Sequence, residues 1–138
     1  MSDNKNNDSY IHKLIDYNER LYGKEIRAKY GNDVIDLSYA KLKGTTAEQR
    51  AENERLENAY KSVLKEAFEA GSPDSELAQK ACALHKEWLC YFWPKYNKDA
   101  HVFVVRMYVD DPRFKKYYDK IAPGCAAFFY EAIKIFCS

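Results

Sequence analysis

The chain has 138 residues, 22 Lys and Arg against 21 Asp and Glu, a formal net charge of +1, and 15% aromatic residues. This length fits one domain with a sizeable core. The balanced charge gives no support for a nucleic-acid, membrane-surface or polyacidic partner bound through bulk electrostatics. No apolar run approaches the ~20 residues that span a bilayer. The polar start MSDNKNNDS lacks the apolar segment of a signal peptide, so a cytoplasmic protein is expected.

The cysteines form no C-x-x-C pair, and no histidine lies at zinc-ligand spacing from them. Without a secretion signal they are interpreted as reduced thiols that pack as small hydrophobic side chains. The sequence therefore predicts neither a metal site nor a cofactor. The residues concerned are Cys82, Cys90, Cys125 and Cys137.

Residues 1–9 are polar and rich in Asn and Asp, and we expect them to be disordered. Apolar residues at helical spacing predict short helices over 10–18 and 19–30. Gly31 ends the second piece, and a further helical piece runs from Asn32 to Gly44. These pieces have a weak core pattern, which favours a lid over residues 10–44 that orders when a ligand binds.

The helices of the remaining segment, 45–138, are predicted to form the binding core. A capping box at Thr45 and Glu48 predicts the start of a long amphipathic helix that ends at Gly71. Ser72 is the expected N-cap of the next helix, over 73–93, because Pro is favoured at the first helical position. Pro94 closes that helix.

The segment from Val102 to Val109 is β-branched and aromatic, and its propensity favours a strand. No other segment is typical of a strand, and an unpaired buried strand would leave backbone groups unsatisfied. We therefore predict a buried helix, capped by Asn97 or Asp99. Two more helices follow, after Asp111-Pro112 and after Pro123-Gly124. The predicted fold is an all-α single domain of about six to eight helices.

Aromatic side chains gather where helix 73–93 would meet this central helix. They are predicted to line a cleft that stacks on a flat, heterocycle-rich ligand, since ligand sites are mostly apolar and aromatic. The alternative is that they form ordinary core. On the helix and its corner the candidates are Trp88, Tyr91, Phe92 and Tyr96, with Trp88 and Phe92 one turn apart; on the opposing wall they are His101, Phe103, Val104 and Met107.

The remaining polar candidates favour structural roles. Neither His85 nor His101 has a second ligand at helical spacing, which favours structural histidines over haem or metal ligands. Asp110 and Asp111 are explained by helix capping and by an ion pair with Arg113, without acid–base chemistry. No enzymatic activity is expected.

Several short motifs resemble those of TipAS-type domains. The block MYVDDPRF at 107–114, APGCAAF at 122–128 and EAI at 131–133 is similar to the family signature. Upstream, HKEW at 85–88 and YGNDVIDLS at 30–38 also resemble family segments. The resemblance covers residues 18–137 in order and with similar spacing.

This resemblance implies a globin-like all-α domain whose cleft binds bulky cyclic antibiotics such as thiopeptides. In the family it is usually the effector half of a MerR-type transcription activator, and it also occurs alone, where it sequesters drug. No helix-turn-helix precedes residue 18, so the resemblance implies the stand-alone form, without direct DNA binding and with a MerR-type regulator as partner.

Some members of the family carry a cleft cysteine that captures the ligand covalently. The corresponding positions here are Tyr96 and Phe103, and Cys125 replaces an apolar leucine. Non-covalent binding is therefore expected. The alternative function is a protein-interaction module that takes a partner helix in the same groove.

Overall fold

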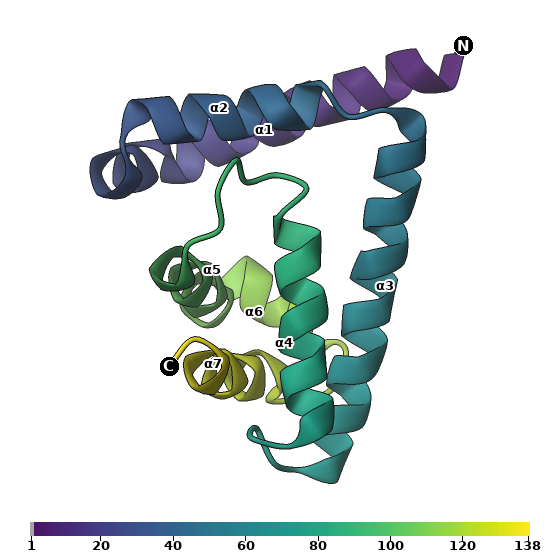
Figure 1. Ribbon diagram of the computed structural model, residues 1–138, viewed down its shortest axis with the longest axis vertical. Helices are drawn as coiled ribbons and strands as arrows, with labels where there is room; N and C mark the ends of the chain where they lie inside the picture. Colours follow the sequence, from purple (N-terminus) through teal and green to yellow (C-terminus); the bar gives the residue numbers. More distant parts are fainter. Residues whose placement is uncertain (1) are drawn as a thin grey trace. The chain divides into compact units, whose positions relative to one another are not determined.

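The computed structural model describes residues 2–138, with side chains from Ile15 onward, and these residues form seven α-helices and no strand (Figure 1). The all-α prediction and the predicted range of helix number are confirmed. No helix in the described part is long and apolar enough to cross a lipid bilayer. The helices are α1 (Ser2–Tyr30), α2 (Asn32–Lys43), α3 (Ala47–Ala70), α4 (Glu76–Leu89), α5 (Lys98–Asp110), α6 (Pro112–Asp119) and α7 (Cys125–Phe136).

The chain divides into two compact units. We call residues 1–52 with 90–95 the N-terminal unit, and residues 53–89 with 96–138 the core unit. The predicted lid at 10–44 and binding core at 45–138 stay predictions. The same holds for disorder at 1–9, because the side chains of these residues lie outside the described part.

Helices α1 and α2 form an antiparallel hairpin (Figure 1). The two pieces predicted over 10–30 are wrong, because nothing between Asn18 and Glu19 breaks the helix and α1 is continuous. Gly31 separates the helices at a φ of 93°, a left-handed backbone that glycine adopts without strain. Arg27 joins the hairpin through ion pairs of 2.6 Å to Glu19 and 2.8 Å to Asp36.

Helix α3 begins with a capping box that lies one residue later than predicted. The Thr46 hydroxyl accepts from the Gln49 amide at 3.1 Å, and the Gln49 side-chain oxygen accepts from the Thr46 amide at 2.8 Å. Glutamine serves as well as glutamate at this position. Thr45 instead donates its hydroxyl to the Leu42 carbonyl at 2.8 Å, which places it at the end of α2.

Helix α4 is shorter at both ends than the predicted helix 73–93. Ser75, not Ser72, is its N-cap, since its hydroxyl accepts from the Ala78 amide at 3.1 Å. At the other end the helix stops at Leu89, five residues before Pro94, so the proline is not what ends it. In the segment after the helix, the carbonyls of Cys90, Phe92 and Trp93 accept from side chains of α2. The one-turn spacing expected for Trp88 and Phe92 is therefore wrong, because Phe92 lies outside the helix.

The central segment forms helix α5, as predicted. Asn97 caps it by accepting from the Ala100 amide at 3.0 Å. Asp111 ends α5 and caps α6 by accepting from the Arg113 amide at 2.9 Å, and it also pairs with the Arg113 guanidinium. The structural role predicted for this aspartate is confirmed.

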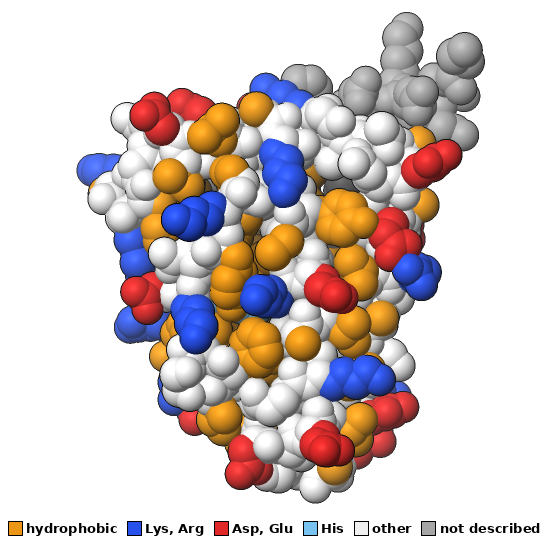
Figure 2. Space-filling view, viewed as in Figure 1, with side chains coloured by type: hydrophobic (Ala, Val, Ile, Leu, Met, Phe, Trp, Pro, Cys, Tyr) orange, Lys and Arg blue, Asp and Glu red, His pale blue; other side chains and the backbone are white. Residues whose placement is uncertain are grey.

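The interior of the core unit is built around α7, which packs against α4, α5 and α6. The largest fully buried side chains come from α3, α4, α5 and α7 and include Tyr60, Leu64, Val105, Phe129 and Ile133. On the face shown in Figure 2, hydrophobic side chains are interspersed with charged ones of both signs. Neither sign of charge dominates that face, which agrees with the balanced composition.

Candidate ligand-binding site

Helix α5 presents two different faces within the core unit. His101, Val105 and Tyr108 recur at helical spacing and are buried. Phe103 and Met107 lie one turn apart on the other side of the helix and are only half-buried. Of the predicted opposing wall, Phe103 and Met107 therefore belong to the outer face, whereas Val104 packs against the core.

Trp88 lies in the last turn of α4 and packs one side of its indole into the core unit. Its ring centroid is 5.6 Å from that of Tyr60 and 5.5 Å from that of His85, in tilted arrangements. Such aromatic pairs add roughly 0.5–1.5 kcal/mol beyond area burial. The indole is half-buried, so it serves as core on one side and as a candidate ligand surface on the other.

Tyr96 lies just before α5 and is half-buried. Its hydroxyl oxygen is 2.8 Å from Nδ1 of His101, and the two rings meet edge to face at 5.5 Å. The ammonium of Lys86 lies 4.3 Å from the centre of the tyrosine ring, within the range of a cation–π contact. Tyr96 is thus held from two sides, one of them a buried histidine.

Two buried histidines continue inward from Tyr96. Nε2 of His101 is 2.8 Å from Nδ1 of His85, and Nε2 of His85 is 3.2 Å from the Tyr108 hydroxyl. We call Tyr96, His101, His85 and Tyr108 the histidine relay. Both imidazoles are fully buried. The relay therefore satisfies all four ring nitrogens inside the protein.

Burial sets the charge of these rings. Desolvation holds the pKa of His85 well below its usual value, and the neighbouring His101 lowers it further. Desolvation, with the charge of Lys86, lowers the pKa of His101 to about 4. Both rings are therefore neutral near pH 7, each with one N–H donor and one acceptor nitrogen.

The inner end of the relay joins a cluster of tyrosines. Tyr108 stacks on Tyr118 with ring centroids 4.4 Å apart. The hydroxyls of Tyr118 and Tyr60 are 2.7 Å apart. Burial raises the pKa of Tyr60 and Tyr118 well above the usual value. These phenols stay protonated and act only as hydrogen-bonding groups.

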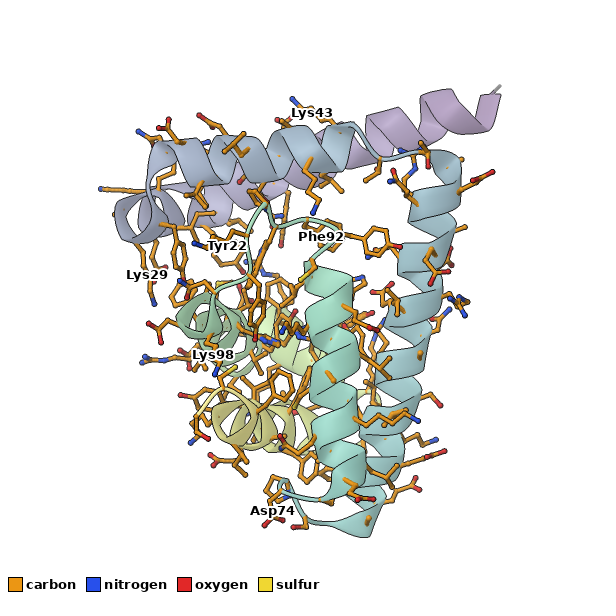
Figure 3. The ribbon with its side chains drawn as sticks, viewed as in Figure 1. Tyr22, Lys29, Lys43, Asp74, Phe92 and Lys98 are labelled. Atoms are coloured by element: carbon orange, nitrogen blue, oxygen red, sulfur yellow. The ribbon has the colours of Figure 1, made fainter. Side chains whose placement is uncertain are left out.

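The other two predicted site residues, Tyr91 and Phe92, lie in the N-terminal unit, in the segment where Figure 3 labels Phe92. Two side chains of α2 hold this segment. The Ser38 hydroxyl donates to the Phe92 carbonyl at 2.6 Å. The ammonium of Lys41 donates to the carbonyls of Cys90 and Trp93 at 2.5 and 2.9 Å. Ligand contact by Tyr91 and Phe92 stays a prediction.

Sequence reasoning missed the pairing of His85 with His101 and the roles of Tyr108, Ser38 and Lys41. The sequence did carry a signal for the histidine pair. His85 lies on the apolar stripe of α4, and a histidine buried there needs polar partners. The partners themselves come from other helices, so no local pattern names them. Among the described residues, no group of three or more His, Cys, Asp or Glu is placed to hold a metal ion.

Two of the four thiols are unsuited to react with a ligand. Desolvation raises the pKa of Cys82 to about 12 and that of Cys125 to about 11, so neither forms a thiolate near neutral pH. Cys90 and Cys137 are half-buried. No cysteine stands at Tyr96 or Phe103, the two positions that the family resemblance singled out.

Comparison with known proteins agrees with this architecture. The chain is 32% identical over 122 residues to the HTH-type transcriptional activator TipA of Streptomyces coelicolor, covering 86% of this chain and 47% of that protein. It is 24% identical over 126 residues to the HTH-type transcriptional activator mta of Bacillus subtilis, covering 91% and 48% of the two chains. The chain thus spans about half the length of the curated relatives it matches.

A solved structure of TipAS from Streptomyces lividans in complex with nosiheptide, described as part of a thiopeptide antibiotic multidrug resistance system, has a similar fold. The TM-score is 0.60 at 29% identity, over 86% of this chain and 85% of that one. The family model of the TipAS antibiotic-recognition domain matches residues 22–136. The chain therefore belongs to the TipAS antibiotic-recognition domain family.

Proposed function

We propose that this protein binds a bulky, hydrophobic, cyclic antibiotic-like ligand without forming a covalent bond to it. The observation that carries the proposal is the match of most of the chain to an antibiotic-recognition family. The complex of a related domain with nosiheptide supports a thiopeptide-like ligand. The raised thiol pKa values of Cys82 and Cys125 support non-covalent binding.

Within the core unit, the proposed ligand contacts are Trp88, Tyr96, Phe103 and Met107. All four side chains are half-buried, so each combines support from the protein with surface left to contact a ligand. Aromatic rings suit flat heterocycles, and methionine adapts to irregular shapes. His101 is fully buried, and in this proposal it reaches the ligand only through Tyr96.

The proposed consequence of binding is a drug response. The curated relatives are transcriptional activators, which favours a role in ligand-dependent regulation of transcription in the cytoplasm, together with a MerR-type DNA-binding module. Sequestration of the drug is the second outcome of the same binding event. A reporter gene that responds to the ligand only in the presence of this protein distinguishes regulation from sequestration.

A titration with nosiheptide tests the binding itself. We expect saturable quenching of tryptophan emission and a rise in melting temperature, since a ligand at ~100 times its Kd adds ~2.7 kcal/mol to the free energy of unfolding. Phe103→Ala and Met107→Ala should weaken binding. Ile135→Ala is the matched control, because this side chain of the core unit is 42% exposed on α7.

The proposal predicts a clear pattern among these proteins. The two α5 variants lose affinity while the control keeps it, and all three keep melting temperatures close to the unmodified protein. Neither quenching nor a thermal shift with nosiheptide and a panel of other thiopeptides would overturn the proposed function.

A further inference from the structure

The strongest unexplained feature of the core unit is the pair of buried histidines behind Tyr96. His101 uses Nδ1 toward the Tyr96 hydroxyl and Nε2 toward His85, each at 2.8 Å. Both rings are fully buried. Simple core packing does not require a polar chain of this length, and a buried polar network is costly unless every member is satisfied.

The two rings constrain each other's tautomers. Only one proton fits between Nε2 of His101 and Nδ1 of His85, which are 2.8 Å apart. If both nitrogens carried a proton, two donors would face each other; if neither did, two lone pairs would. Either arrangement leaves buried polar groups unsatisfied, which is unfavourable. Two neutral rings are therefore protonated jointly, both on Nε2 or both on Nδ1.

The joint tautomer decides what Tyr96 offers to its surroundings. When both rings carry the proton on Nε2, Nδ1 of His101 is an acceptor and Tyr96 donates its hydroxyl proton inward. When both carry it on Nδ1, the Tyr96 oxygen accepts from His101 and its O–H points elsewhere. One neighbour of this hydroxyl is Sγ of Cys137 at 3.7 Å, a weak hydrogen-bonding partner.

The inner end of the relay accommodates both states. With protons on Nε2, His85 donates to the Tyr108 oxygen. With protons on Nδ1, Tyr108 donates its hydroxyl proton to His85. A tyrosine hydroxyl can donate or accept, so the bond between His85 and Tyr108 persists in both states and a hydrogen bond at Tyr96 can select between them.

We propose that His101 and His85 are positioning residues for ligand recognition: their joint tautomer fixes whether Tyr96 presents a hydrogen-bond donor or an acceptor to the ligand. The inference rests on the proposed function, because it takes Tyr96 as a ligand contact. A ligand rich in azole nitrogens and carbonyls is rich in acceptors. Binding such a ligand selects the state with both protons on Nδ1, in which Tyr96 donates outward.

Two conservative variants test the coupling without any ligand. Tyr96→Phe removes the acceptor of the His101 Nδ1 proton, so both rings should move to the Nε2 form. Tyr108→Phe removes the acceptor of the His85 Nε2 proton, so both rings should move to the Nδ1 form. Each change keeps the aromatic ring and its packing. Two-bond proton–nitrogen NMR spectra of the full chain labelled with ¹⁵N-histidine report the tautomer of each ring.

The expected result is a joint response in opposite directions. Opposite tautomers on the two rings of one protein, or the same tautomers in both variants, would overturn the proposal. These two variants test the coupling of the tautomers, and only the response to a ligand tests its role in recognition.

The ligand arm uses nosiheptide as the probe, with tryptophan quenching as an independent measure of binding. Tyr96→Phe should lower affinity by roughly 2- to 10-fold, the loss of one neutral hydrogen bond. Tyr108→Phe, already in the donor-presenting state, should bind at least as tightly as the unmodified protein. Saturable quenching with unchanged histidine tautomers overturns the positioning role alone, whereas no quenching at all overturns the proposed function.

Discussion

The Ser38 hydroxyl donates a 2.6 Å hydrogen bond to the carbonyl oxygen of Phe92, across 54 positions of sequence. In the N-terminal unit, the carbonyls of the segment after α4 have no helical amide to accept from. The Ser38 hydroxyl and the Lys41 ammonium donate to them instead. A helix end requires partners for its last carbonyls. Here Ser38 and Lys41 supply such partners for segment 90–95. Their hydrogen bonds fix the backbone of Tyr91 and Phe92, two predicted ligand contacts.

Removal of this serine should loosen the segment 90–95. Ser38→Ala leaves the Phe92 carbonyl without its donor, and we expect a loss of about 1 kcal/mol of local stability. Hydrogen exchange followed by mass spectrometry should show faster exchange in peptides covering 90–95. The exposed Lys43→Ala on the same helix is the control. Equal exchange in both variants would show that the bond contributes nothing.

The buried histidines should make the protein less stable in mild acid. The unfolded chain binds a proton at His101 below its usual pKa of 6.5, whereas the folded protein does not until about 4. The stability contributed by the neutral ring is thus complete above pH 6.5 and is lost as the pH falls to 4, by on the order of 3 kcal/mol. The pKa of His85, well below the usual value, extends this loss to lower pH.

Denaturant unfolding at several pH values measures this dependence. The reference is the double variant His85→Asn with His101→Asn, which lacks both titrating groups but keeps every carboxylate. Its free energy of unfolding should approach that of the unmodified protein as the pH falls from 6.5 to 4. If the two free energies of unfolding differ by the same amount at every pH in this range, the imidazoles do not cause the loss of stability in acid.

Gly124 should tolerate alanine poorly although space is available. It precedes α7 at a φ of 91°, a backbone conformation that side chains with a Cβ rarely adopt. An added Cβ would meet Phe68 only at an ordinary contact distance of 3.7 Å. The cost is therefore backbone strain of roughly 1–2 kcal/mol, measured as a shift in the denaturation midpoint. Gly44→Ala is the matched control, since Gly44 caps α2 at a φ of −83°.

The thiols should differ in reactivity. Iodoacetamide at pH 8 should modify the half-buried Cys90 and Cys137 in the native protein, and Cys82 and Cys125 only after denaturation. The last two are buried with pKa values of about 12 and 11, and the thiolate is the reactive form. Peptide mass spectrometry locates each adduct. Modification of native Cys82 as fast as Cys90 would contradict the burial of Cys82.

Local pattern predicted most of the helices in this fold. The caps at Asn97 and Asp111 and the buried central helix were readable because capping and amphipathic spacing depend on neighbours in sequence. The course of segment 90–95 was not, since its carbonyls accept from α2 side chains about 50 positions away in sequence. The predicted capping box lay one residue too early, because Thr45 and Glu48 fit the same sequence motif as Thr46 and Gln49.

The candidate site likewise combines features that follow from local sequence with features that depend on distant residues. Composition indicated aromatic side chains, and helical spacing separates Phe103 from the buried face of α5. The chemistry behind Tyr96 arises only when α4 and α5 bring His85 and His101 together, which is tertiary information. A histidine on an apolar stripe signals that a partner is needed, but not which residue supplies it.

The tilted contact between Trp88 and His85, with ring centroids 5.5 Å apart, has an optical consequence. The emission of an indole depends on the groups packed against its ring, and here one of them is an imidazole of the relay. The protein therefore carries an intrinsic fluorophore beside its buried relay. Replacing the other tryptophan, Trp93, leaves Trp88 as the single indole emitter, so its intensity reports on the surroundings of the buried relay without any label.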